Sequence, residues 1–293
     1  MPEGPECSII AWRLGRHLAG SQVTTIDIHN GRYAKLLEAA RSNIVEFNAA
    51  IADKPATVQQ VGSKGKLVYA RFDNGWAMLS TMGLSGSWVT NRVAHCGLSL
   101  RSTDAQGRER TTWFKDQLHY GTIKFVPTAD LDKKLAALGP DAVLGEAGGC
   151  TPEWWLGLCK RKKEWTLPKL LMEQKHIAGV GNYLKAEALH EARASPLVKI
   201  EDFSDAELLI VLRAVLAVTA RCYQWKAHRA GIPGHEAKVP RFVMKVYGKG
   251  LDPQRRKVAK VKTTDGRATF WVPEAQLLPG PRPAAPAPPS TAV

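Results

Sequence analysis

Leu138-Gly139-Pro140 marks the point at which the periodicity of the sequence changes. From about residue 21 up to this point, short β-rich runs alternate with turn residues such as Asp73-Asn74-Gly75. After it, apolar residues recur at helical spacing. Many short strands separated by turns are typical of a β-sandwich or a barrel. The sequence therefore predicts an α+β fold in which a β-sandwich is followed by a helical domain, with a cleft between them.

The part before residue 140 is predicted to begin with a helix and to continue as strands. An amphipathic helix is expected over residues 3–19, because Ile9, Leu14 and Leu18 lie at helical spacing and Gly20 can end it. The predicted strands are Val23–Ile28, Lys66–Phe72, Trp76–Thr81, Gly97–Arg101, Thr111–Phe114 and Thr122–Val126.

The part after residue 140 is predicted to be helical. Thr151 is a candidate N-cap, because Pro152 follows it at the first helical position. Ser204 and Glu207 form a capping box ahead of a helix from Ala206 to Gln224.

Residues 236–278 form a basic segment of their own. Two runs, Val258–Lys262 and Ala268–Val272, flank the turn at residues 263–267 and predict a β-hairpin. The last residues are rich in Pro and Ala and are expected to be disordered. The predicted division of the chain is into residues 1–140, 141–235, 236–278 and 279–293.

The charge of the chain indicates a polyanionic partner. Of 293 residues, 41 are Lys or Arg and 27 are Asp or Glu, so the net charge is +14. Such a charge is typical of proteins that bind nucleic acid, although a basic solvated surface without a partner would also produce it. No apolar run approaches the roughly 20 residues needed to cross a bilayer, and no signal peptide is recognisable. We therefore expect no membrane association and a location in the cytoplasm or the nucleus.

The cysteines are scattered and none forms a CxxC pair. The sequence predicts neither a disulfide framework nor a zinc-knuckle spacing. We expect reduced, buried thiols at Cys7, Cys96, Cys150, Cys159 and Cys222.

Pro2 and Glu3 are candidates for covalent chemistry. Removal of Met1 would leave Pro2 with a secondary α-amine; α-amines have a pKa near ~8, so a useful fraction is nucleophilic at neutral pH. Attack on a sugar C1′ atom would give an iminium ion that acidifies the C2′ proton, as strand cleavage after base loss requires. Glu3 could act as an acid towards the sugar ring oxygen. The alternative is an ordinary helix start, where Pro and Glu are common.

Four further residues are suited to binding nucleic acid. Lys66 follows a glycine turn and can bind phosphate, and Leu84 lies in a glycine-flanked loop from which it could wedge between bases. Asn182 follows the glycine-rich residues 179–181, whose N–H groups can bind phosphate at a helix start. Arg267, on the basic hairpin, can clamp a phosphate. An ordinary hairpin, a helix–helix turn and a solvated turn would explain each segment equally well.

In this order the segments resemble the formamidopyrimidine-DNA glycosylase / endonuclease VIII family of bifunctional DNA glycosylases. The resemblance covers nearly the whole chain to about residue 278. Gly4 resembles the endonuclease VIII branch, since the formamidopyrimidine branch usually has leucine there. The resemblance rests on Pro2-Glu3-Gly4-Pro5-Glu6, Gly65-Lys66, Gly83-Leu84-Ser85-Gly86-Ser87, Gly179-Val180-Gly181-Asn182 and Gly266-Arg267-Ala268-Thr269-Phe270.

The resemblance implies catalytic roles for residues at matching positions. Pro2 would be the Schiff-base nucleophile, and Glu3 would be the general acid at the ribose ring. Lys66 would contact phosphate and assist elimination. Arg267, counted with the catalytic residues, would bind the phosphates beside the extruded nucleotide together with Asn182.

The resemblance also implies a DNA interface. The glycosidic carbon is inaccessible inside a stacked duplex, so the damaged nucleotide must be flipped out, and Leu84 would fill the gap. Where the family usually carries Arg-Arg-Phe-Gly in its second intercalation loop, this chain has Leu118, His119 and Tyr120 before a glycine. Tyr120 can still stack on bases, whereas Leu118 in place of arginine puts strong reading of the opposite base in doubt.

The C-terminal hairpin departs from the family in a second way. Many members hold this finger with four zinc-binding cysteines, but none of the residues at the corresponding positions can bind zinc. The resemblance therefore implies a zincless β-hairpin finger after a helix–two-turns–helix domain, with no metal and no cofactor. The four positions are Gln254, Lys257, Val272 and Ala275.

Two classes of function follow from these residues. The first is a monomeric DNA glycosylase and AP lyase that acts on damaged double-stranded DNA, with oxidised pyrimidines and ring-opened or hydantoin purines as implied substrates and 8-oxoguanine as the rival. The second is a DNA-binding protein that keeps the scaffold without catalysis. Pro2 and Glu3 favour the enzyme, because a protein that only binds DNA needs no terminal secondary amine.

Overall fold

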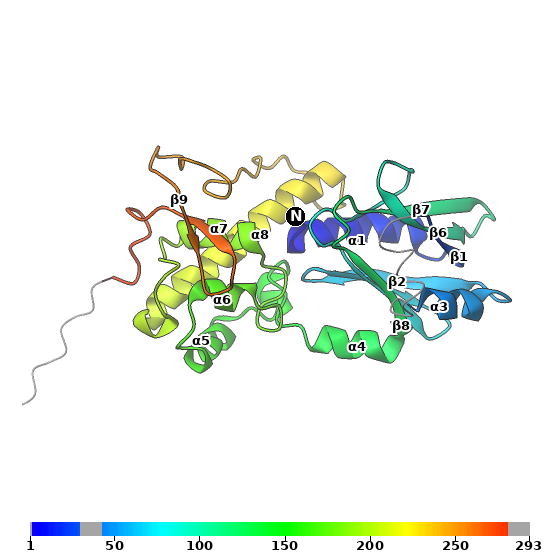
Figure 1. Ribbon diagram of the computed structural model, residues 1–293, viewed down its shortest axis with the longest axis horizontal. Helices are drawn as coiled ribbons and strands as arrows, with labels where there is room; N and C mark the ends of the chain where they lie inside the picture. The colour runs from blue at the N-terminus through cyan, green and yellow to red at the C-terminus, as the bar shows by residue number, and fades with distance from the viewer. Residues whose placement is uncertain (1, 30–42, 281–293) are drawn as a thin grey trace, which may run out of the picture.

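The structure of the protein, a computed structural model, describes residues 2–29 and 43–280. These residues form two parts that lie side by side along the longest axis of the molecule (Figure 1). One part is mostly strands, the other is mostly helices, and the N-terminus lies where they meet. The α+β class, with a β-sandwich followed by helices, is thus confirmed. The domain boundaries at residues 140, 235 and 278 stay predictions, and the predicted disorder of residues 281–293 falls outside the described residues.

The sandwich is one antiparallel sheet that divides into two layers. In the described part of the chain its strand order is β5-β7-β6-β1-β2-β3-β4-β8. β1 pairs with β6 along its length but with β2 only through Gln22–Thr57 and Val23–Ala56, so the sheet separates at this short junction. Side chains of both layers then share one core. The strands are β1 Gln22–Ile28, β2 Ala56–Lys64, β3 Leu67–Phe72, β4 Trp76–Thr81, β5 Ser87–Val89, β6 Cys96–Thr103, β7 Glu109–Lys115 and β8 Thr122–Pro127.

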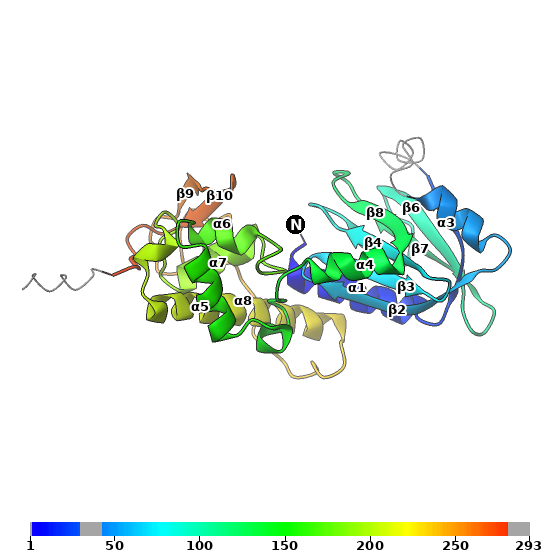
Figure 2. The same ribbon diagram turned by 90° about the horizontal axis from the view of Figure 1, so that it is seen from below.

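Among the described residues, three helices accompany the sandwich. The predicted N-terminal helix is α1 (Gly4–Leu18), which buries one apolar face in the sandwich core. The sequence did not predict α3 (Ile44–Ile51), whose Phe47 ring stacks on Phe125 with a centroid distance of 4.2 Å. It also missed α4 (Thr128–Ala136), which lies along the sandwich near β3 and β4 (Figure 2).

The helical part is built around α7. This part contains α5 (Pro152–Arg161), α6 (Leu167–Met172), α7 (Asn182–Glu191) and α8 (Asp205–Ala230), with short 3₁₀ turns at Gly145–Gly148 and Ile200–Asp202. The predicted caps are confirmed: Thr151 accepts a hydrogen bond from the Trp154 N–H, and Ser204 and Glu207 form the capping box of α8. All of α7 from residue 182 to residue 190 is buried, including its polar side chains.

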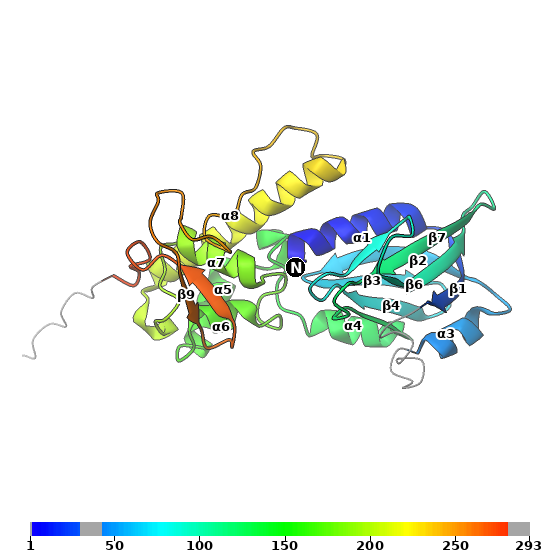
Figure 3. The same ribbon diagram turned by 45° about the horizontal axis from the view of Figure 1, so that its top comes forward.

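The predicted β-hairpin is confirmed as β9 (Ala259–Lys262) paired with β10 (Ala268–Trp271). It stands beside α7 in Figure 3. Val246, Val272 and Ala275 form a small apolar cluster with Ala186 of α7. Two other apolar side chains of the segment, Val243 and Leu277, lie outside this cluster and are 58% and 61% exposed.

Within residues 2–29 and 43–280, no helix has the length and apolar character that a membrane span requires. The five cysteines are free and buried, as predicted.

Candidate active site

The carboxylate of Glu3 is bound at the N-terminus of α7. Its Oε2 accepts hydrogen bonds from the N–H groups of Gly181 (2.8 Å) and Leu184 (3.2 Å), and its Oε1 accepts one from Tyr183 (2.9 Å). A helix N-terminus presents unpaired N–H groups and the positive end of the helix dipole, so a carboxylate is stabilised there. Of the N–H groups of residues 179–181 that were expected to bind phosphate, that of Gly181 is thus taken by Glu3 and that of Gly179 by Gln174 Oε1 at 3.0 Å.

Burial raises the pKa of Glu3 to about 7. The side chain has no exposed surface, and the lost hydration disfavours the charged form. The positive charge of Lys66 and the hydrogen bonds from Tyr183 and Leu184 lower the pKa, but by less than burial raises it. The carboxyl group therefore keeps its proton up to about neutral pH, as a general acid requires.

A cavity of about 540 Å³ lies beside Pro2, the residue that precedes Glu3. Its lining brings together Pro2, Lys66 and Arg267, which come from the N-terminus, the β2–β3 turn and the finger. Glu3 does not line the cavity, but its neighbour Pro2 does. Three of the four residues predicted to be catalytic thus line one cavity, and the fourth, Glu3, is buried next to Pro2 in the chain.

Lys66 is half-buried and follows a turn that the helical part holds in place. The N–H of Gly65 donates to Asp141 Oδ2 at 2.8 Å, and Gly65 has a φ of +56°. A Cβ atom at residue 65 would lie 2.7 Å from the Cβ of Ala178, so a side chain has no room there. Burial lowers the pKa of Lys66, against the opposing effect of Glu3. Its amine therefore loses its proton at a lower pH than the amine of an ordinary lysine does.

The predicted wedge residues lie on two loops that contact each other. Leu84 and Tyr120 line the cavity and are 40% and 59% exposed, and Leu118 is 50% exposed. Ser85 Oγ donates to Asp116 Oδ1 (2.7 Å) and accepts from the Leu118 N–H (2.9 Å), which joins the loops. His119 lies between the two exposed residues with a φ of +56°. Insertion of these side chains into DNA stays a prediction.

Asn182 and Arg267 meet at the junction of α7 and the finger. Asn182 Nδ2 donates to the carbonyl oxygen of Ala268 at 3.1 Å, and its buried Oδ1 has no partner among the described residues. Arg267 is exposed, and its guanidinium forms no hydrogen bond or ion pair with another described residue. A free guanidinium at the cavity can bind a phosphate through two parallel hydrogen bonds.

Sequence reasoning missed Glu6 as part of the site. Its carboxylate accepts from the N–H of Glu3 (3.0 Å), from the hydroxyl of Tyr183 (2.9 Å) and from Lys226 (3.1 Å). These contacts fix the first turn of α1 against α7 and α8. The capping spacing between Glu3 and Glu6 was visible in the sequence, but the partners from residues 183 and 226 were not.

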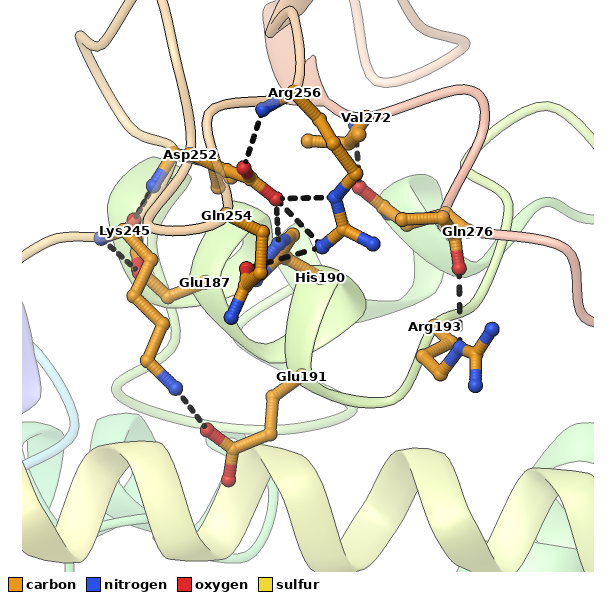
Figure 4. A network of polar contacts seen from close by, with 12 residues as sticks. Glu187, His190, Glu191, Arg193, Lys245, Asp252, Gln254, Arg256, Val272 and Gln276 are labelled. Atoms are coloured by element: carbon orange, nitrogen blue, oxygen red, sulfur yellow. Dashed lines mark hydrogen bonds and ion pairs between the residues drawn. The ribbon is translucent and has the colours of Figure 1, made fainter.

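A network of polar contacts lies at the base of the finger (Figure 4). Asp252 accepts from the Arg256 side chain (2.8 Å) and lies 3.4 Å from His190 Nε2, on α7. Two of the four positions that carry cysteines in many family members, Val272 and Ala275, are buried in the apolar cluster. In the parts of the chain that the structure describes, no group of three or more His, Cys, Asp or Glu residues could hold a metal ion.

Comparison with known proteins finds related DNA glycosylases. A model of the formamidopyrimidine-DNA glycosylase N-terminal domain matches residues 1–123. The formamidopyrimidine-DNA glycosylase of Acidothermus cellulolyticus is 26% identical over 292 residues, which cover 95% of this chain and 98% of that protein. That of Lactiplantibacillus plantarum is 23% identical and covers 95% of this chain and 100% of its own length. The family model and the full-length relatives support assignment of the chain to the formamidopyrimidine-DNA glycosylase / endonuclease VIII family.

Solved structures share the fold of this glycosylase. The Lactococcus lactis formamidopyrimidine-DNA glycosylase, bound non-covalently to DNA containing an AP site, has a TM-score of 0.74 at 18% identity, covering 94% of this chain and 99% of its own. The Thermus thermophilus MutM (Fpg) protein has a TM-score of 0.72 at 24% identity, covering 94% and 98%. The family consists of DNA repair glycosylases with AP lyase activity, and the present glycosylase is an enzyme of that class. Its predicted place in the endonuclease VIII branch is not confirmed.

The pKa of Glu3 leads to a pH prediction for this glycosylase. We expect the ratio of base excision to cleavage of a preformed abasic site to fall as the pH rises through about 7, because Glu3 then loses its proton. Both reactions need the same amine, so its titration cancels in the ratio. Single-turnover rates on a lesion duplex and on the matching abasic duplex would measure this ratio. A ratio that stays constant across the range would show that excision does not use the Glu3 proton.

The network at the base of the finger leads to a second prediction. We expect treatment with a strong chelator to leave both the unfolding temperature and the strand-cleavage rate of this glycosylase unchanged, because Asp252, Arg256 and the apolar cluster support the finger. Metal analysis of the purified protein would accompany the two measurements. Stoichiometric zinc, with activity lost on chelation, would overturn the zincless interpretation.

Proposed function

We propose that the enzyme removes oxidised bases through a Schiff base on the amine of Pro2 and then cleaves the strand. The observation that carries the proposal is the cavity that Pro2, Lys66 and Arg267 line, with Glu3 buried next to Pro2 in the chain and protonated up to about pH 7. The proposal requires that Met1 is removed, because only a free N-terminal proline is a secondary amine.

The steps follow from the positions of these groups. The Pro2 nitrogen bonds to C1′ while the glycosidic bond breaks, and the base leaves with the proton that the amine loses. A proton from Glu3 passes to the sugar ring oxygen as the ring opens to an iminium ion. C2′ then loses a proton to a base, for which the neutral amine of Lys66 is suited, and the C3′–O bond breaks. Loss of a further proton from C4′ breaks the C5′–O bond, which completes β and δ elimination.

Damaged double-stranded DNA is the proposed partner of the single chain. Arg267 and Asn182 would bind the phosphates beside the flipped nucleotide, and Leu84, Leu118 and Tyr120 would fill the gap in the duplex. Their exposure supports this assignment, as does the net charge of +14. Such a substrate would place the enzyme in the compartment that contains the DNA, the cytoplasm or the nucleus.

The proposed class of lesion depends on the resemblance of Gly4 to the endonuclease VIII branch and on the substrates seen with a related protein. Gly4, which resembles the endonuclease VIII branch, has a packing reason of its own: a Cβ atom there would lie 2.8 Å from Val143 Cγ2 and 3.0 Å from Gly179 Cα. The related Lactococcus lactis protein has been solved with DNA that contains an oxidised pyrimidine and with DNA that contains Fapy-dG. We propose oxidised pyrimidines and ring-opened or hydantoin purines as substrates, with 8-oxoguanine as the alternative.

A panel of duplexes, each with one lesion, tests this proposal. We expect faster excision of oxidised pyrimidines, formamidopyrimidines and hydantoins than of 8-oxoguanine, and a dependence on the opposite base of less than about tenfold, because Leu118 offers no hydrogen bond to that base. A marked preference for 8-oxoguanine opposite cytosine would favour the alternative. Tight lesion binding with no excision or strand cleavage on any duplex would instead indicate a non-catalytic DNA-binding protein.

A further inference from the structure

A buried ion pair joins α7 to the turn that carries Arg267. Lys185 Nζ lies 2.7 Å from Asp265 Oδ2, and the two side chains are 0% and 4% exposed. Lys185 is on the buried helix whose N-terminal N–H groups bind Glu3. Asp265 is in the β9–β10 turn, two residues before Arg267.

Asp265 is bonded in turn to the backbone of Arg267. Thr263 Oγ1 donates to Asp265 Oδ1 (2.5 Å), and the N–H of Thr263 donates to the carbonyl oxygen of Arg267 (3.0 Å). On the other side of the arginine, Asn182 donates to the carbonyl of Ala268 (3.1 Å). Two residues of α7 therefore hold the turn that carries Arg267, Lys185 through Asp265 and Asn182 through Ala268. The guanidinium of Arg267 itself forms no hydrogen bond or ion pair with a described residue.

The burial of this pair needs an explanation other than stability. Two charges removed from water lose hydration energy that their mutual attraction does not always recover, so a buried ion pair is weak evidence for a stabilising role. Replacement of such a pair by apolar residues of similar volume often leaves stability unchanged or raises it. A single lysine–carboxylate contact, however, fixes one geometry of the turn, which apolar packing does less well.

We propose that Lys185 is a positioning residue that, through Asp265, holds Arg267 at the cavity lined by Pro2. The inference rests on the proposed phosphate-binding function of Arg267. Without the lysine, the turn would sample other conformations. Binding of a phosphate by the guanidinium would then be weaker, because the turn would lose conformational entropy on binding.

A double-mutant cycle tests the coupling between the two residues. The three variants are Lys185→Met, Arg267→Ala and the combined variant. Methionine has nearly the length of lysine but no charge. The matched control is Lys262→Met, which removes an exposed lysine from β9 of the same hairpin. Equilibrium binding would be measured at one salt concentration, on a duplex containing a tetrahydrofuran abasic analogue and on the undamaged duplex. Unfolding temperatures would be recorded for each variant, and Asp265→Asn would replace Lys185→Met if the latter does not fold.

We expect the preference for the abasic analogue to fall about tenfold in Arg267→Ala and by a similar factor in Lys185→Met, as for loss of one charge-assisted phosphate contact. The combined variant should bind within about twofold of Arg267→Ala alone, because the lysine acts through the arginine. Lys262→Met should weaken binding to both duplexes to the same extent, as the loss of a charge without a positioning role would.

Two results would overturn the inference while leaving the proposed function in place. The first is a Lys185→Met protein with wild-type preference for the abasic analogue. The second is a combined variant whose loss equals the product of the two single losses, which would mean that Lys185 acts on the whole fold. If wild-type protein does not prefer the abasic analogue, or if Arg267→Ala has no effect, the proposed function of Arg267 itself fails, and the inference with it.

Discussion

Replacement of Glu3 by glutamine is expected to slow base excision by about 100- to 10,000-fold, the range typical of a lost general acid, while cleavage of a preformed abasic site changes little. Glutamine has nearly the same shape but no proton to give to the sugar ring oxygen. Its amide group would also face one of the backbone N–H groups that now bond to the carboxylate, which lowers stability. The two rates would be measured on the lesion duplex and on the matching abasic duplex.

The chain offers a matched control for this experiment. Glu187 is also buried on α7 and accepts three backbone N–H groups, from Lys245 (2.7 Å), Val246 (2.9 Å) and Tyr247 (2.8 Å). Glu187→Gln should therefore lower the unfolding temperature to a similar extent. It should not change the ratio of excision to abasic-site cleavage, because neither Glu187 nor the residues that it holds, 245–247, line the cavity. Glu3, in contrast, directly follows Pro2 in the chain and interacts electrostatically with Lys66, and both of these residues line it. If both variants lower that ratio equally, Glu3 has only a structural role.

Blocking the amine of Pro2 is expected to reduce borohydride trapping of the protein on abasic DNA by about three orders of magnitude or more, as for removal of a nucleophile. An N-terminal extension converts the amine into an amide, whose nitrogen is not nucleophilic. Pro2→Gly keeps a primary amine and should retain a small residual activity. The exact mass of the untreated protein would show in the same experiment whether Met1 is absent.

Lys66 is the rival nucleophile in this experiment. Its amine lines the same cavity, and burial lowers its pKa towards the range in which a lysine can form a Schiff base. Peptide mapping of the trapped complex distinguishes the two amines directly. A cross-link on Lys66, or trapping that survives the N-terminal extension, would refute the assignment of Pro2.

The sequence predicted most strands and both helix caps, because periodicity and capping are local signals. It missed β2, where a register shift between Val58 and Gln60 interrupts the alternation of apolar and polar residues. It missed β5, which has only three residues, and α3, which has only eight. Patterns this short do not rise above chance in a sequence.

The site was predictable only as a set of candidates. Residues 2, 66 and 267 each have a plain structural explanation, and their order along the chain, through the family resemblance, was what linked them. The buried charges around them were not predictable, because Asp141, Lys185 and Glu187 look like ordinary solvated residues in the sequence. Only the fold reveals that each is buried against a specific partner.

Glu3 connects the two halves of the molecule, so the pKa of its carboxyl group depends on the contact between them. Its backbone belongs to the strand-rich half, whereas the N–H groups around its carboxylate belong to the helical half. Any movement that drew α1 away from α7 would admit water, return the carboxyl group to its ordinary acidity and release the proton at neutral pH. Separation of α1 from α7 would therefore release up to one proton per molecule at about pH 6 to 7, which a proton-release measurement would detect.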